Sequence, residues 1–251
     1  MTAALDAANG GQPSEEPGPR PRIAVIDYGA GNLVSIGQAL QAVGADVTLA
    51  ARPDGIGGAD ALVVPGVGAA APAMDRLRRR RLLDSILQWL AEDRPFLGIC
   101  LGEQLLFDGS DEDSARTFGV IAGRTSALTG APRLPHIGRN QVELRREHPL
   151  FDGIPSGSNF YFVHSYAGVP TGPDADRVNL AETVHGHRFV SAVARGRMAG
   201  VQFHPERSGR DGLRLLANFV RTLWAPNEAA GAVELTSATR EPAIAVGARS
   251  H

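Results

Sequence analysis

The first half of the chain alternates short apolar runs with segments of helical spacing. Four runs, RIAVID, ADVTLA, ALVVPG and FLGIC, occupy 22–27, 45–50, 61–66 and 96–100. Apolar runs of this length, bounded by Gly or Pro, are typical of strands buried on both faces. Helical spacing appears at 33–43 and 74–93. Strands that alternate with helices predict an α/β fold with a parallel sheet and right-handed crossovers.

The pattern changes after Phe107. Strand-like runs broken by Gly, Pro, Asp or Asn follow, and we expect several of them to pair antiparallel; they lie at 141–151, 159–169, 177–186, 187–196 and 197–205. Residues 211–224 return to helical spacing and close the domain.

The arginine run 78–81 falls inside the second predicted helix and is interpreted as a solvated helix face rather than a binding patch.

Composition separates one domain from two tails. Residues 1–21 are rich in Ala, Gly, Pro and acidic side chains, and 225–251 show no sustained period, so both are predicted to be disordered extensions of a domain over 22–224. The net charge of −2 gives no chain-wide basic surface for nucleic acid. We find neither a signal peptide nor an apolar stretch of the roughly 20 residues that span a membrane. The single cysteine excludes an internal disulfide, and we expect a cytoplasmic protein.

That cysteine lies between an apolar run and a helical pattern. Cys100 lies in the middle of Gly98-Ile99-Cys100-Leu101-Gly102. The segment LGEQLLF, residues 101–107, follows it and has helical spacing. The pattern G-x-C-x-G at such a junction is typical of a nucleophile elbow, whose glycines allow a sharp turn at the carboxyl edge of a sheet. Amides at the start of the following helix favour a thiolate. A lone cysteine without this context is more often a packing residue.

Two further motifs supply the other parts of a cysteine hydrolase. In VQFHPERS, Pro205 holds the chain extended, so that Glu206 can orient His204 while His204 takes the thiol proton. A histidine alone would more often be a surface or core residue than a catalyst. The glutamate two positions later makes a catalytic role less improbable without making it the more frequent case. Pro65-Gly66-Val67-Gly68 ends the third apolar run and can turn amides toward a substrate carbonyl, beside the amide of Leu101.

In their order, PGVG, GICLGEQ and QFHPERS resemble the class I glutamine amidotransferase family. Within it, DYGAGNLVSIGQAL, LPHIGRN and YFVHSY look like the glutaminase subunits of imidazole glycerol phosphate synthases. The resemblance covers roughly 22–224. It implies a flavodoxin-like, mostly parallel sheet flanked by helices, with additional antiparallel strands.

The resemblance also implies an activity and a set of site residues. Glutamine would be hydrolysed to glutamate and ammonia through a cysteine thioester, by Cys100, His204 and Glu206. Amides of Val67 and Leu101 would bind the oxyanion, and the glutamine pocket would contain Gly66, Gln104, His164, Ser165 and Tyr166. In resting members of the family the PGVG strand is often turned away, and one oxyanion amide is supplied only when the partner binds its substrate. No cofactor and no metal are implied.

The implied partner is a cyclase subunit, a (βα)8 barrel, bound as a heterodimer. It would use the ammonia to make imidazole glycerol phosphate and an aminoimidazole carboxamide ribotide in histidine biosynthesis. Positions that match the partner-facing side of the family are Asn32, His136, Arg139 and Asn140.

Two positions depart from the family pattern, and three alternatives stay open. The family usually has tryptophan at the position of Arg139 and a hydrophobic residue at the position of Glu103. Glu103 is interpreted as a harmless acid near a helix N-terminus.

Arg139 leaves open the alternative that the chain is a paralogue, which would supply ammonia to a related barrel that amidinates a surface sugar. A non-catalytic, partner-stabilising module is opposed by the intact Cys, His and Glu set. A peptide-cleaving cysteine hydrolase lacks support from YFVHSY and LPHIGRN.

Overall fold

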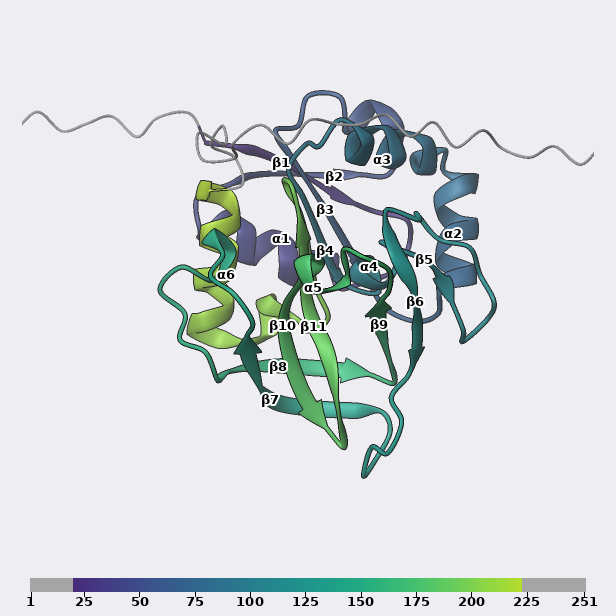
Figure 1. The fold of residues 1–251 in the computed structure, drawn as a ribbon. Coiled ribbons are helices and arrows are strands. Elements are labelled where there is room, and N and C mark those ends of the chain that lie inside the picture. Colours follow the sequence, from purple (N-terminus) through teal and green to yellow (C-terminus); the bar gives the residue numbers. More distant parts are fainter. Residues whose placement is uncertain (1–19, 223–251) are drawn as a thin grey trace, which may run out of the picture.

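The structure, a computed structural model, describes residues 20–222, in which helices flank a large sheet (Figure 1). The strands of this sheet are β1 (Arg22–Ile26), β2 (Asp46–Ala50), β3 (Ala61–Gly66), β4 (Phe96–Cys100), β7 (His136–Leu144), β8 (Ser158–His164), β10 (Asn179–His185), β11 (His187–Arg195) and β12 (Met198–Val201). A second sheet contains β5 (Phe107–Ser110), β6 (Ile121–Ala127) and β9 (Tyr166–Pro170). The predicted tails, except residues 20 and 21, lie outside the described residues.

The large sheet has nine strands in the order β2-β1-β3-β4-β12-β11-β10-β7-β8. Neighbours from β2 to β12 are parallel, and neighbours from β12 to β8 are antiparallel. The parallel part has the 2-1-3-4-5 order of flavodoxin-like folds, with β12 as its fifth strand. The predicted α/β class and the antiparallel pairing in the second half of the chain are both confirmed.

Helices cover both faces of the parallel strands. Alternate residues of β1 separate the two cores: Ile23 and Val25 face one side, and Ala24 and Ile26 face the other. The first side is covered by α1 (Leu33–Ala42) and α6 (Gly209–Thr222), and the second by α2 (Ala70–Arg79) and α3 (Leu82–Ala91) (Figure 1). The shorter helices are α4 (Leu101–Gln104), α5 (Ala175–Val178), and the 3-10 turns Pro53–Gly55, Pro149–Phe151 and Pro205–Arg207.

Three local predictions were wrong. The strand β2 is not buried on both faces, because it forms the edge of the sheet and only Ala50 is fully buried. The segment 74–93 contains two helices, since Arg81 adopts a left-handed conformation with φ of 60° and ends the first. The predicted helix LGEQLLF is a single turn, so its dipole contributes less to the site than expected.

The arginine run therefore crosses a break between helices and is only partly a solvated face. Arg78, Arg79 and Arg81 are exposed, as expected. Arg80 instead forms a salt bridge with Asp27, with Nη1 and Oδ1 separated by 3.2 Å, and Arg76 donates a hydrogen bond to the carbonyl oxygen of Gly29. These contacts join α2 to the loop between β1 and α1.

Within residues 20–222, no helix is long and apolar enough to cross a membrane.

Candidate active site

Three strand ends bring the predicted catalytic motifs together at the carboxyl edge of the sheet. In the parallel pairing of β3 with β4, Gly66 lies opposite Cys100. On the other side of β4, the parallel strand β12 leads to His204, which forms an isolated bridge with Tyr161 of β8. Residues about 100 positions apart thus become neighbours because their strands are adjacent.

The backbone at Cys100 makes a sharp, strained turn. Its φ of 54° and ψ of −112° are unusual for a residue that carries a Cβ. The flanking glycines permit this turn: a Cβ added to Gly98 would lie 2.4 Å from the carbonyl oxygen of Gly102, and a Cβ added to Gly102 would lie 1.7 Å from that of Val64. The prediction that the sharp turn depends on glycine at both positions is confirmed.

Gly102→Ala is therefore expected to destabilise the protein by about 3 kcal/mol or more, because the backbone must shift to relieve the overlap with β3. The measurement is urea unfolding followed by circular dichroism. Gly57→Ala is the matched control, since Gly57 is exposed and its added Cβ would have its nearest neighbour at 4.0 Å. Equal losses in the two variants would contradict the steric argument.

His204 is oriented by Glu206 and charged by its surroundings. Its Nδ1 lies 2.9 Å from Oε1 of Glu206, and both side chains are buried. Nε2 is buried and has no hydrogen-bond partner among the described residues, which leaves it available to Cys100. Burial lowers the pKa of His204, but the interactions with Cys100 and Glu206 outweigh this effect and raise it to about 10. The raised pKa favours the protonated imidazole at neutral pH.

A cavity of about 250 Å³ opens over Cys100. It contains five of the residues predicted to bind glutamine or the oxyanion, namely Val67, Gln104, His164, Ser165 and Tyr166. Gly66 and Leu101 lie behind this lining; a Cβ added to Gly66 would lie 2.9 Å from Cβ of Leu101. The lining also includes Gly68, Glu112, Pro135 and Val163. The residues are assembled as a substrate site requires, while the role of each one stays a prediction.

Residues 24–223 match the family model described as Glutamine amidotransferase class-I. The chain belongs to the class I glutamine amidotransferase family. It is 45% identical over 215 residues to the imidazole glycerol phosphate synthase subunit HisH of Synechococcus sp. (strain JA-3-3Ab), covering 84% of this chain and 98% of that protein. It is 46% identical over 201 residues to the protein of the same name from Symbiobacterium thermophilum, covering 80% and 93%.

The fold of this amidotransferase also resembles solved structures. The structure of PurLQS from Thermotoga maritima superposes with a TM-score of 0.63 at 17% identity, covering 80% of this chain and 98% of that one. A glutamine amidotransferase from the same organism gives a TM-score of 0.60 at 15% identity, covering 82% and 99%. At these identities the likeness supports the fold alone.

The residues predicted to face a partner have structural roles in this amidotransferase chain. Asn32 caps α1 by accepting a hydrogen bond from the amide of Ser35. Both Nη atoms of Arg139 lie 3.4 Å from carbonyl oxygens just after the His-Pro-Glu motif, those of Arg207 and Ser208. His136 is buried, and Asn140 is half-buried beside it. Contact with a partner stays a prediction for all four predicted residues.

Glu103 lies in the first turn of α4, as expected, but it is not a harmless acid there. Its side chain is fully buried, and neither carboxyl oxygen has a hydrogen-bond partner in the described part of the chain. Burial raises its pKa to about 8, so the carboxyl group is mainly protonated at pH 7. The earlier interpretation was wrong because the single turn of α4 directs this residue into the core, where a Cβ added to Gly200 would lie 2.7 Å from its Cγ.

Two buried residues near Cys100 were missed as site residues. Gln202 is fully buried and donates a hydrogen bond from Nε2 to Sγ of Cys100 at 3.6 Å. The hydroxyl of Tyr28 lies against Gly66, and burial, followed by the charge of Cys100, raises its pKa. Both residues fall inside segments already recognised, QFHPERS and DYGAGN, so proximity in sequence to a motif was the signal available.

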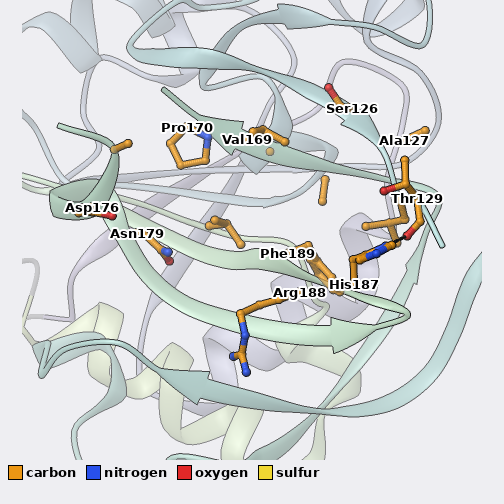
Figure 2. A pocket seen from close by; sticks show the side chains of 15 residues that line it. Ser126, Ala127, Thr129, Val169, Pro170, Asp176, Asn179, His187, Arg188 and Phe189 are labelled. Atoms are coloured by element: carbon orange, nitrogen blue, oxygen red, sulfur yellow. Dashed lines mark hydrogen bonds between the residues drawn. The ribbon is translucent and has the colours of Figure 1, made fainter. Parts of the chain in front are cut away.

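A second hollow of about 300 Å³ lies between β6, β9 and β11 (Figure 2). There, His187 is turned toward Thr129, whose carbonyl oxygen lies 2.6 Å from Nδ1. None of the predicted catalytic residues is among the residues lining this hollow. The cavity over Cys100 is therefore the candidate active site.

Proposed function

We propose that this chain is the glutaminase subunit of an imidazole glycerol phosphate synthase. It would hydrolyse glutamine in the cytoplasm and supply ammonia to a cyclase subunit in histidine biosynthesis. The observation that carries the proposal is the buried set of Cys100, His204 and Glu206, of which Cys100 lines a cavity of about 250 Å³. The name shared by relatives that are 45% and 46% identical supports the same choice and does not favour the sugar-amidinating alternative.

In the proposed reaction, the predicted site residues act in sequence. The Cys100 thiolate attacks the side-chain amide carbon of glutamine, and the resulting oxyanion is bound by the amides of Val67 and Leu101. Protonated His204 gives its proton to the departing ammonia, which leaves a glutamyl thioester. His204, now neutral and held by Glu206, takes a proton from water, and the hydroxide formed attacks the thioester to release glutamate.

The cyclase partner would bind at the carboxyl edge of the sheet, where Asn32 and the strand β7 lie. Asn32, His136, Arg139 and Asn140 are the proposed contacts. Ammonia would pass from the cavity over Cys100 toward this side. Neither a metal nor a cofactor enters the reaction as proposed.

The test is to mix the protein with candidate barrel subunits and to measure glutamate release with and without the ribulosyl substrate. We expect weak hydrolysis by the chain alone and a rise of about 10- to 100-fold with the liganded cyclase, as coupling between two sites typically gives. Equal turnover in both conditions would rule out activation through the PGVG segment. Absence of glutamate under every condition would overturn the proposed function.

A further inference from the structure

We propose that Gln202 is a further catalytic residue of this site, which stabilises the Cys100 thiolate by donating a hydrogen bond to the sulfur. This inference rests on the proposed role of Cys100 as nucleophile. Gln202 follows β12 and is fully buried. Its Nε2 lies 3.6 Å from Sγ, a hydrogen-bonding distance for the large sulfur atom.

The orientation of the Gln202 amide is determined by its other neighbour. Oε1 of Gln202 lies 2.8 Å from Nε2 of Gln104, which is a donor. Turning the Gln202 amide over would place two NH2 groups against each other and an oxygen against the sulfur. Gln104 is fixed in turn, because its Nε2 also donates to the carbonyl oxygen of Tyr166, an atom that can only accept.

Two hydrogen-bonded histidines, His136 and His164, lie on the other side of the Tyr166 carbonyl oxygen. Nδ1 of His164 lies 2.8 Å from the Tyr166 oxygen and must donate to it. Burial lowers the pKa of His164 to about 3, so its ring is neutral and Nε2 accepts a hydrogen bond from Nδ1 of His136 at 3.1 Å. Nε2 of His136 then accepts from Asn140, whose Oδ1 is occupied by the amide of Gln141.

Every link in this chain has a donor on one side and an acceptor on the other. The series runs from Asn140 on β7 through the two histidines to the Tyr166 carbonyl, and on through Gln104 and Gln202 to the sulfur. Buried and fully connected polar networks of this kind hold their members in a single arrangement. The Gln202 N–H is therefore directed at Sγ before any substrate arrives.

A preformed donor favours the charged form of the acceptor it meets. Hydrogen bonds to charged groups are strong enough that removing one is expected to raise the apparent pKa of the thiol by about one to two pH units. His204, two residues further along the same segment after β12, is a second group that interacts with the sulfur. The proposal concerns only the contribution of Gln202.

The experiment is alkylation by iodoacetamide as a function of pH, because the rate follows the thiolate fraction. Cys100 is the only cysteine of the chain, so the full-length protein reports on this sulfur alone. For Gln202→Met, which has similar length and no donor, we expect the midpoint of the rate profile to rise by about one to two pH units. Gln88→Met, an exposed position on α3, is the control and should leave the midpoint unchanged.

Gln202→Asn is the second variant, in case the apolar replacement does not fold. It keeps an amide in the core but withdraws the donor from the sulfur, and the same rise is expected. A folded variant of either kind with the midpoint of the parent would overturn the proposal. Because alkylation needs neither glutamine nor a cyclase, this result is independent of whether the proposed glutaminase activity is found.

Discussion

Cys100→Ala is expected to lower glutamine hydrolysis by at least about 10⁴-fold, because the variant has no atom that can form the thioester. Synthesis by the cyclase partner from added ammonium should persist at the parent level. Only the ammonia source is removed, while the surface that binds the partner is unchanged. The expected signature is therefore a loss with glutamine and no loss with ammonium.

Two assays check this result, glutamate release from glutamine and product formation with ammonium chloride. The second assay is the internal control, since a misfolded variant would fail in both. The buried position of Cys100 makes the small substitution suitable, because it adds no volume to the core. Glutamate release at the parent rate would show that another residue is the nucleophile.

Glu103→Met should stabilise the protein by about 3 kcal/mol at pH 7, because it removes a buried carboxyl group without a hydrogen-bond partner. The pKa of Glu103 is raised from 4.5 to about 8 by burial. A raised pKa means that its contribution to stability is fully present below pH 4.5, and is lost as the pH rises through about 8. The benefit of the substitution should grow over that range.

Urea unfolding at pH 5 and pH 8 measures the difference between parent and variant at each pH. Glu103→Gln separates the two possible causes, since it abolishes the titration while it keeps a buried polar group. We expect the pH dependence of the difference to appear in both variants, and the full gain only in Glu103→Met. A gain that is the same at both pH values would show that Glu103 is ionised inside the fold or is already neutral when unfolded.

Much of the fold and the site was predictable because both depend on local pattern. The continuous apolar runs of β3 and β4 predict central parallel strands. The glycines around Cys100 are explained by contacts within their own turn and with the neighbouring strand β3. The contact between His204 and Glu206 was predicted correctly, but its backbone was not: the chain was expected to be extended at Pro205, and it forms the 3-10 turn Pro205–Arg207 because the carbonyl oxygens of His204 and Pro205 accept hydrogen bonds from the amides of Arg207 and Ser208.

The remaining features depend on which elements become neighbours, and local pattern does not contain that information. The apolar run of β2 looks like those of β3 and β4, but its place at the sheet edge leaves it exposed. The burial of Glu103 follows from β12 passing over it. The chain from Asn140 to Gln202 links residues from four separate segments, and none of its members is unusual within its own segment.

The order of strands in the sheet also sets the time at which a newly made chain becomes reactive. Cys100 and β4 are synthesised early, whereas His204 follows 104 residues later and reaches the sulfur only when β12 pairs with β4. At typical translation rates that interval lasts roughly 5 to 20 s. During it the thiol has neither its base nor Gln202, so an incomplete chain on the ribosome carries an inactive cysteine until its last strand is in place.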